Sequence, residues 1–210
     1  MVHTMKGIRP SMLSMLFAVF ALAACQYSPT AASGDVPHAA IPSQQAATTI
    51  TAADIGRAQT WGGIDNVVSV KHLFFSAQPD RAALQVAREH GVGVVINLRE
   101  PSEFEWDEPA EVQRLGMAYF NLPVSTEGTG LNQETMETIS RLVRQHANQK
   151  ILLHCSSGNR ASAWFAVHLA NDHGMGAEQS IALARQAGLD QLQMENRVRN
   201  YLGRSVHDNL

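Results

Sequence analysis

The chain has 210 residues, of which 45% are hydrophobic and 17% charged, and it contains two cysteines. This length and composition are those of a single globular domain with enough chain to bury a core. The formal net charge of −3 argues against nucleic acid or an anionic surface as the main partner.

The N-terminal residues have the pattern of an export signal. Lys6 and Arg9 precede the apolar run SMLSMLFAVFALAAC, which ends at Cys25 and is too short to span a bilayer as a permanent helix. We therefore expect a signal peptide over residues 1–24. Its removal takes away two of the 16 basic residues and no acidic one, which leaves 14 basic against 19 acidic residues.

The end of this run, LAAC, resembles a bacterial lipobox, in which cleavage leaves the cysteine N-terminal and lipidated. The resemblance implies that Cys25 is lipidated, and the alternative is a plain signal peptide followed by a chance cysteine. Gln26 stands where an Asp would retain a lipoprotein in the inner membrane. We therefore expect an exported protein of the bacterial periplasm, tethered to the outer membrane and touching the membrane only through its lipid.

A second segment follows the signal. Residues 26–58 are rich in Ala, Pro, Ser, Thr and Gln and carry almost no large apolar side chains. Such a composition buries too little surface to offset the entropy of ordering. We expect a flexible tether over residues 25–58, with a span of roughly 30 Å as a random coil, and a catalytic domain over residues 59–210.

Strands and helices alternate through the remaining chain. The patterns predict one or two short strands within 66–79, a helix over 80–91, strands over 92–100 and 117–124 with a short helix over 107–116 between them, a helix over 131–148, a strand over 150–155, and helices over 160–172, 177–187 and 190–202. This alternation favours an α/β fold with a mainly parallel four- to five-stranded sheet flanked by helices.

Ligands of such sheets bind outside the carboxyl ends of the strands. Three strand ends should therefore converge, namely NLRE (97–100), LPVS (122–125) and HCSSGNR (154–160). If Cys25 is lipidated, Cys155 is the only thiol of the mature chain, so an intramolecular disulfide is excluded. The alternatives for Cys155 are a buried, inert core cysteine and a reactive one.

The loop that contains Cys155 has the composition of an anion cradle. Ser156, Ser157 and Gly158 are small enough for a tight strand-to-helix loop whose backbone N–H groups and following helix N-terminus attract an anion. This setting predicts that Cys155 is a thiolate near neutral pH. The amides of residues 156–160, including that of Asn159, would bind the substrate oxyanion, and Arg160 would grip it with its planar guanidinium.

A thiolate beneath an anion-binding loop can attack phosphorus, giving a cysteinyl-phosphate, or sulfur, giving a persulfide. Neither reaction requires a cofactor or a metal, and His168 and His173 have poor spacing for metal ligands. A tight strand–helix connection without chemistry is the remaining alternative for this segment.

The loop HCSSGNR resembles the signature loop of cysteine-dependent tyrosine phosphatases but is one residue shorter. Arg160 lies five positions after Cys155, the spacing of many rhodanese-type sulfurtransferases. The stretches FFSAQPD (74–80), GVGVVINLRE (91–100), GMAYFNLPV (116–124) and HCSSGNRASA (154–163) are similar in order and spacing to the bacterial beta-lactamase-hydrolase-like, phosphatase-like domain family. The resemblance covers about residues 61–190 and implies a fold like that of dual-specificity phosphatases.

The resemblance also implies a general acid on a loop upstream of the cysteine, yet no Asp lies between Asp107 and Cys155. Glu127 follows the LPV strand, where that acid usually sits, and is the positional candidate. The other acidic residues expected near the strand ends are Glu100, Glu103, Glu105, Asp107 and Glu108, and each of them can instead be a solvated surface charge. A missing acid would restrict a phosphatase to good leaving groups, whereas sulfane transfer needs no acid.

Three further residues are candidates for supporting roles. We expect His154 to fix the loop through a hydrogen bond rather than act as a base. Ser162 would hydrogen-bond the thiolate, as a hydroxyl after the loop does in tyrosine phosphatases, although Ala161 intervenes here. Arg99 would orient an acid or bind substrate.

Three functions therefore compete. The first is hydrolysis of phosphate monoesters through Cys155, the second is sulfur transfer through a Cys155 persulfide, and the third is non-catalytic binding of an anion or a partner protein. The flanking motifs favour phosphate, while the loop length and the missing Asp favour sulfur. In either enzyme the substrate is an anion.

Overall fold

A computed structural model of the protein describes residues 49–128 and 131–207, with side chains up to Gly203. The predicted signal peptide, Cys25 and most of the predicted tether lie outside these residues. Within the described ranges, no helix has both the length and the apolar character needed to cross a membrane.

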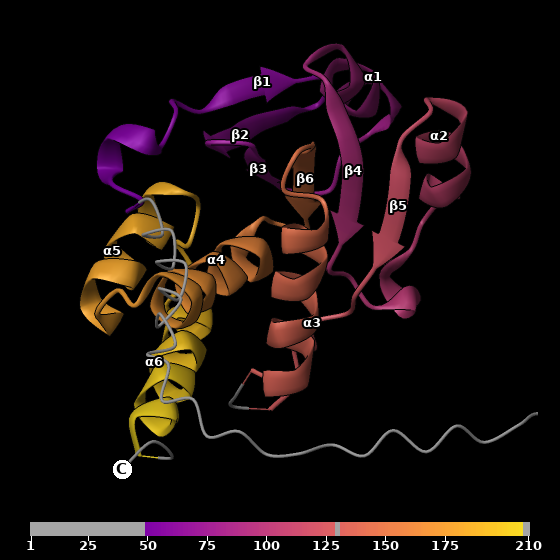
Figure 1. The fold of residues 1–210 in the computed structure, drawn as a ribbon. Coiled ribbons are helices and arrows are strands. Elements are labelled where there is room, and N and C mark those ends of the chain that lie inside the picture. The colour runs from indigo at the N-terminus through magenta and orange to yellow at the C-terminus, as the bar shows by residue number, and fades with distance from the viewer. Residues whose placement is uncertain (1–48, 129–130, 208–210) are drawn as a thin grey trace, which may run out of the picture. The chain divides into compact units, whose positions relative to one another are not determined.

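The centre of the domain is a six-stranded sheet in the order β1-β2-β3-β6-β4-β5 (Figure 1). Its strands are β1 (Gln59–Trp61), β2 (Ile64–Val70), β3 (Leu73–Ser76), β4 (Val92–Asn97), β5 (Ala118–Asn121) and β6 (Lys150–His154). β3, β6, β4 and β5 run parallel, whereas β1–β2 and β2–β3 pair antiparallel. The predicted α/β class with a mainly parallel sheet is confirmed.

The sheet has more strands than the four to five predicted, because the antiparallel edge was only partly recognised. Strand β1 has three residues and an irregular register with β2, so it shows no alternation that a sequence pattern can reveal. The turn between β2 and β3 is formed by two residues, of which Lys71 has a positive φ of 54°. The structure therefore resolves the stretch 66–79 into the end of one strand and a second complete strand.

Six helices flank the sheet. They are α1 (Arg81–Glu89), α2 (Glu108–Arg114), α3 (Gln133–Gln145), α4 (Asn159–His173), α5 (Ala177–Gln186) and α6 (Leu192–His207), and two 3₁₀ turns are η1 (Ala52–Asp54) and η2 (Pro101–Glu103). Side chains of Asp80, Asp107 and Asn132 accept hydrogen bonds from the first turns of α1, α2 and α3, which explains where these helices begin.

Two apolar clusters lie on opposite faces of the sheet. Leu152 of β6 packs with buried residues of α1 and α2, whereas its neighbours Ile151 and Leu153 pack with those of α3, α4, α5 and α6. This alternation is the expected period of a strand covered on both faces. The sheet is therefore the middle layer between helices on either side (Figure 1).

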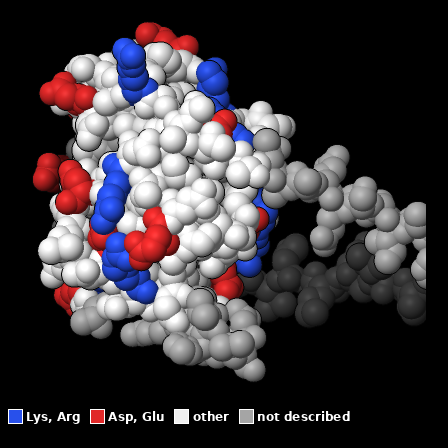
Figure 2. Space-filling model, turned by 90° about the vertical axis from the view of Figure 1, so that its left-hand side faces the viewer, with Lys and Arg blue, Asp and Glu red and all other residues white. Residues whose placement is uncertain are grey.

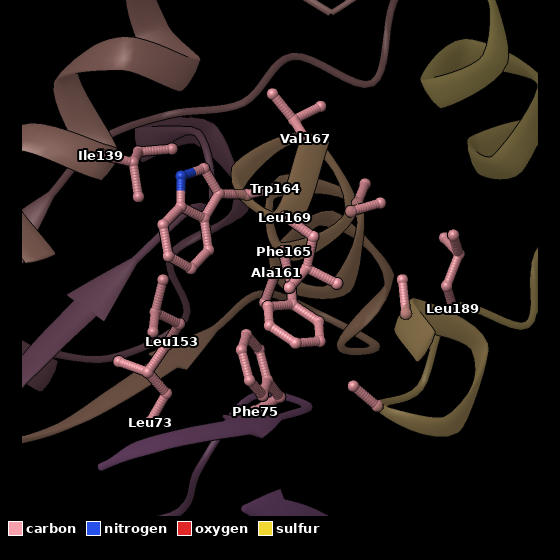
Figure 3. Packing of buried hydrophobic residues seen from close by; sticks show 14 of the residues in the cluster. Leu73, Phe75, Ile139, Leu153, Ala161, Trp164, Phe165, Val167, Leu169 and Leu189 are labelled. Carbon is pink, nitrogen blue, oxygen red and sulfur yellow. The ribbon is translucent and has the colours of Figure 1, made fainter. Parts of the chain in front are cut away.

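Helix α4 is the best-buried helix, since every residue from Asn159 to Leu169 is buried. Figure 3 shows Phe165 of α4 against Phe75 of β3, with their ring centroids 5.1 Å apart. Trp164 is also fully buried, and its Nε1 donates to Ser140 of α3 over 3.2 Å. Each such aromatic side chain contributes about 2–3 kcal/mol by burial. The N-terminus of α4, which follows the cysteine loop, is thereby held in a fixed place.

The folded part begins before residue 59. Ile50 is buried in the core, Ile55 forms a bridge with Val70, and the Gly56 N–H donates to the Ser69 carbonyl over 2.7 Å. Residues 49–58 therefore pack against the domain and do not belong to a free tether. A single isoleucine every five residues gave too little pattern to predict this contact.

Candidate active site

The three strand ends predicted to converge do so. In the sheet register, His154 at the end of β6 pairs with Ser76 of β3 and Asn97 of β4, and Asn97 pairs with Asn121 of β5. Leu98, which follows Asn97, donates its N–H to the His154 carbonyl over 2.9 Å. All four parallel strands therefore end at one level, and the loop after β6 leaves from its centre.

This loop carries Cys155, whose side chain is 1% exposed and free of any disulfide. The Gly158 N–H donates to the Cys155 Sγ over 3.1 Å. Gly158 has a φ of +92° and precedes the first residue of α4, so a residue with a Cβ would be strained at this turn. Ser156 and Ser157 are exposed, which leaves the mouth of the loop open to solvent.

Arg160 lies in the first turn of α4 with only 2% of its surface exposed. Its Nη1 donates to the carbonyls of Leu98 and Val124, each over 3.3 Å, and its Nη2 donates to the Ser156 Oγ over 2.7 Å. The guanidinium therefore touches the segments that follow β4 and β5 as well as its own loop. The three predicted strand ends therefore meet at the Arg160 side chain.

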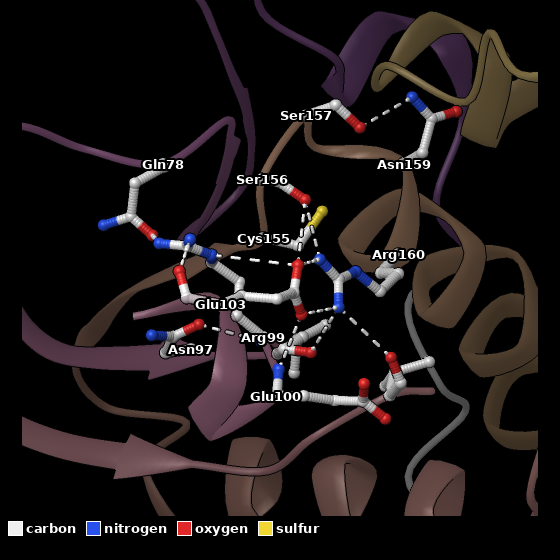
Figure 4. Close-up of polar contacts among 12 residues, drawn as sticks. Gln78, Asn97, Arg99, Glu100, Glu103, Cys155, Ser156, Ser157, Asn159 and Arg160 are labelled. Carbon is white, nitrogen blue, oxygen red and sulfur yellow. Dashed lines mark hydrogen bonds and ion pairs between the residues drawn. The ribbon is translucent and has the colours of Figure 1, made fainter. Parts of the chain in front are cut away.

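The carboxylate of Glu103, from η2, forms a bidentate ion pair with Arg160. Its two oxygens lie 2.7 Å from Nη1 and Nη2 (Figure 4). These hydrogen bonds lower the pKa of Glu103 to about 2. Burial opposes the charge of Arg160, but Glu103 and the neighbouring Cys155 more than offset it and raise the pKa of the guanidinium. Glu103 is therefore an ionised partner of Arg160 and is unsuited to donate a proton near neutral pH.

Arg99 supports this ion pair from the other side. Its Nη2 donates to the Glu103 carbonyl, and its Nη1 donates to the Gln78 Oε1 over 2.6 Å. Its Nε lies 3.9 Å from the Glu103 carboxylate. Arg99 therefore contacts the acidic residue Glu103, while a role in orienting a catalytic acid or in binding substrate stays a prediction. Gln78 was not predicted as a site residue, although its place directly after β3 is a signal of the same kind as that of Asn97.

Glu127, the predicted general acid, lies on the segment that follows β5. It is exposed, and its backbone carbonyl accepts a hydrogen bond from Arg197 of α6, which also donates to the Ser125 carbonyl over 2.8 Å. Its carboxylate makes no hydrogen bond or ion pair with any described residue. The role of Glu127 as the general acid therefore stays a prediction.

The other acidic residues have different roles. The Glu100 N–H donates to the Glu103 carboxylate over 2.7 Å, and Glu105 is exposed. Asp107 caps α2 by accepting from the Ala110 N–H over 3.1 Å. Glu108 is buried, with 3% exposed, and lies beside His154. Among residues 49–128 and 131–207, no carboxyl group is thus found beside the cysteine loop in a position to donate a proton.

Ser162 does not contact the thiol as predicted. Its Oγ bonds to the carbonyls of Gly158 and Ala187, over 3.2 and 2.7 Å. The extra residue between Arg160 and Ser162, Ala161, turns this hydroxyl around the helix toward the end of α5. The prediction that it bonds the sulfur is therefore wrong.

The Asn159 side chain lies mainly against the loop between α5 and α6, and its Nδ2 also donates to the Ser157 Oγ over 3.4 Å (Figure 4). Its Oδ1 accepts from the N–H groups of Asp190 and Gln191, and its Nδ2 donates to the Asp190 Oδ1 over 2.8 Å. The side chain thus fixes the loop between α5 and α6 against the start of α4. Gln191 in turn donates to the Ser157 Oγ over 3.4 Å, a contact that no sequence pattern indicated.

No group of His, Cys, Asp and Glu side chains in the described part of the chain has the arrangement of a metal site. The face over α5 and α6 shows acidic and basic side chains close together, with neither sign forming a continuous patch (Figure 2). Ion pairs such as Arg185–Glu195 and Arg199–Glu178 join α5 and α6.

The mainly parallel sheet, with a cysteine loop between a central strand and a buried helix, is similar to the fold of solved phosphatase-like structures. A candidate phosphatase of Shewanella putrefaciens (DUF442) is similar, with a TM-score of 0.52 and 22% identity over 66% of this chain and 91% of that one. Tk-PTP in its active form gives a TM-score of 0.54 at 22% identity, over 63% of this chain and 91% of that one. At these identities the likeness shows the fold.

TpbA of P. aeruginosa, in complex with phosphotyrosine, gives a TM-score of 0.54 at 16% identity, over 70% of this chain and 91% of that one. Among curated proteins, the beta-lactamase hydrolase-like protein of Xylella fastidiosa is 30% identical over 125 residues, which are 57% of this chain. The chain covers 28% of the length of that relative. No protein-family model matches. The predicted resemblance to beta-lactamase-hydrolase-like and phosphatase-like proteins is confirmed.

Proposed function

We propose that the protein hydrolyses phosphate monoesters through a covalent cysteinyl-phosphate on Cys155. The observation that carries this proposal is the loop itself, in which a buried thiol accepts the Gly158 N–H and the guanidinium of Arg160 lies at the same mouth. The phosphatase-like fold and the phosphotyrosine complex of TpbA support a phosphate ester as substrate.

The first step forms a bond between the Cys155 Sγ and phosphorus, while the bond to the leaving-group oxygen breaks and the oxygen keeps the electron pair. In the second step, water attacks phosphorus, the S–P bond breaks and inorganic phosphate leaves with return of the thiolate. Loop N–H groups and Arg160 stabilise the charge on the equatorial oxygens in both steps. Nothing in the described site protonates the leaving group, so that oxygen must leave as a weakly basic anion or take its proton from water.

Two apolar side chains support an aryl leaving group. Among the described residues, Phe104 and Leu192 are the exposed large hydrophobic side chains, with 36% and 71% of their surface accessible. Each directly follows a residue that bonds the loop, namely Glu103 on Arg160 and Gln191 on Ser157. Aryl phosphates suit both features of the site. Their leaving group is apolar, which the two exposed side chains favour, and its oxygen is weakly basic, which the lack of a placed acid favours.

Phosphate release from an activated aryl phosphate tests the proposal. The chain is expected to turn over this substrate, and Cys155→Ser is expected to lower the rate at least about a thousandfold. Cys25→Ser serves as the matched control, because it removes the other cysteine and is expected to keep the rate. A folded, reduced protein without Cys155-dependent release would contradict phosphatase chemistry.

Sulfur transfer is the second candidate. It is favoured by the arginine five residues after the cysteine and by the absence of a placed acid, since thiosulfate gives up its sulfane sulfur without protonation of a leaving group. In that reaction Sγ bonds to the sulfane sulfur, the S–S bond of thiosulfate breaks and sulfite leaves with the electron pair. Sulfite release and a persulfide on Cys155 would establish it, and their absence beside phosphate turnover would exclude it.

We further propose that the protein is exported and anchored through a lipid on Cys25. The basic residues, apolar run and LAAC sequence support this location. The catalytic domain would then act in the periplasm at the membrane surface.

A further inference from the structure

Glu108 is a buried carboxylate to which the reaction above assigns no role. It is the first residue of α2 and lies at the ends of three strands. Its Oε2 accepts from the Asn97 Nδ2 and from the Gln78 Nε2, both over 3.1 Å. Its Oε1 lies 2.8 Å from the Nε2 of His154, although the ring N–H is not aligned for a full hydrogen bond. One side chain thus binds residues that follow or end β3, β4 and β6.

Helix capping does not explain this burial. The N-terminus of α2 is already capped by Asp107, and the Glu108 carboxylate turns away from the helix toward the sheet. Removing a carboxylate from water costs several kcal/mol unless partners replace the water. Here two amide groups and an imidazole do so, with His154 fully buried and Glu108 3% exposed. The group therefore has specific partners at the back of the cysteine loop.

The contacts of Glu108 lead to both ends of that loop. On one side, His154 immediately precedes the nucleophile. On the other, Gln78 accepts from Arg99 over 2.6 Å, Arg99 donates to the Glu103 carbonyl, and Glu103 holds Arg160. Figure 4 shows the second half of this chain, from Gln78 through Arg99 to Arg160. A displacement of the Glu108 carboxylate would therefore change the positions of both the Cys155 Sγ and the Arg160 guanidinium.

We propose that Glu108 is a positioning residue for Cys155. The Glu108 carboxylate orients His154 directly and Arg160 through Gln78, Arg99 and Glu103. A carboxylate 2.8 Å from Nε2 favours the imidazole tautomer with its hydrogen on that nitrogen, and thereby one orientation of the ring. The inference rests on the proposed function only in that Cys155 is the nucleophile, and it holds equally for phosphate and for sulfur chemistry.

Other charged or titratable groups lie near this carboxylate. The Asn97 Nδ2 that bonds Glu108 also donates to the Tyr119 hydroxyl of β5 over 3.0 Å, and Tyr119 is close enough to feel the charges of Glu108, Arg99 and Asp107. Burial raises the pKa of Tyr119 to about 12, so this phenol stays neutral in the range tested. The Glu103–Arg160 pair lies further along the chain of contacts. Of these, only Glu108 contacts His154 directly through a charge.

Alkylation of Cys155 by iodoacetamide as a function of pH tests the proposal. The full chain carries Cys25→Ser, so that Cys155 is the only thiol. With Glu108→Gln, the pH of half-maximal alkylation is expected to rise by about one unit, and the rate at pH 7 to fall about fivefold, because the Arg160 guanidinium near the sulfur loses its orientation. This loss is expected to outweigh the removal of the Glu108 charge, which by itself would favour the thiolate. Glu111→Gln is the matched control, since this carboxylate of the same helix pairs with Arg114 at the surface.

An alkylation curve of folded Glu108→Gln that coincides with that of the control would overturn the proposal. If this variant does not fold, Gln78→Ala decides, because it cuts the chain of contacts before Arg99 at a half-buried position. It is expected to raise the half-maximal pH by about half a unit, and an unshifted curve would count against the inference. Alkylation needs no phosphate turnover, so failure of the phosphatase reaction leaves this result interpretable.

Discussion

Two loops leave the same edge of the sheet, and they hold their polar groups in opposite ways. The loop from Cys155 to Arg160 turns its thiol and guanidinium inward, and both are nearly fully buried. The segment from Val124 to Glu127 is held by its backbone carbonyls, which accept from Arg160 and Arg197, while the Glu127 carboxylate faces solvent. The first loop therefore supplies reactive side chains. The second contributes backbone carbonyls that hold Arg160 and Arg197.

The carboxylate that completes the site comes from a third segment. Glu103 of η2 pairs with Arg160 across 57 residues of sequence. A carboxylate in this position balances the charge of the guanidinium and fixes its plane, whereas a proton donor would have to stay protonated near neutral pH. The proposed reaction would therefore depend on Arg160 and the loop N–H groups rather than on an acid placed to protonate the leaving group.

Arg160→Lys is the change with the largest expected effect on activity. Lysine keeps the charge but cannot bond Glu103, Ser156 and an oxyanion at once. We expect kcat/KM for an aryl phosphate to fall about a thousandfold. Arg185→Lys, at a surface ion pair with Glu195, is the control. A loss below tenfold for Arg160→Lys would show that the guanidinium does not bind the transition state.

Glu103→Gln follows in size. The amide keeps the shape but loses the charge that holds Arg160, and we expect kcat/KM to fall about tenfold, mainly through kcat. Glu105→Gln, two residues further on and exposed, is the matched control. Unchanged kinetics would mean that the guanidinium keeps its place without this partner.

The same variant tests stability against pH. The pKa of Glu103 is lowered from 4.5 to about 2, so its contribution is present above pH 4.5 and is lost as the pH falls through 2. We expect Glu103→Gln to lower the free energy of unfolding by about 2 kcal/mol at pH 7 and by progressively less below pH 4. Urea unfolding at a series of pH values measures both. A difference that does not depend on pH would contradict the ion pair as its origin.

Glu127→Gln has a small expected effect. Because the carboxylate contacts no described residue, we expect rates with aryl and alkyl phosphates to stay within about twofold of the unmodified protein. The pH profile of kcat with each substrate is the measurement. A tenfold loss confined to the alkyl phosphate, together with a lost alkaline limb, would make Glu127 the acid after all.

Cys25→Ser leaves the site untouched and tests only the anchor. Expression in a bacterial host with a labelled fatty acid is expected to label the unmodified protein and not the variant, with equal activity in both. Labelling of neither protein would refute lipidation.

Local patterns predicted much of this structure. The β-branched run before Asn97 indicated a strand buried on both faces, and the small residues after Cys155 indicated a tight loop ahead of a helix. Both features depend on residues close together in sequence. The convergence of strand ends followed from topology, because parallel strands end at a common edge.

Other features depend on contacts that a local pattern does not encode. Glu103 stood among several acids in an exposed segment, and only the fold places it on Arg160 rather than Glu127 or Glu105. Ser162 was misplaced because one added residue rotates a helical side chain by about 100°. Ile50 escaped notice because a single buried side chain in an Ala- and Thr-rich segment leaves no periodicity.

Acid quench of the enzyme during turnover of an aryl phosphate, followed by mass spectrometry of the peptide that contains Cys155, tests the central claim most directly. The account predicts a peptide heavier by one phosphoryl group, located on Cys155 and absent from Cys155→Ser. A peptide that stays unmodified during turnover, or one that gains sulfur from thiosulfate while aryl phosphate remains intact, would contradict it.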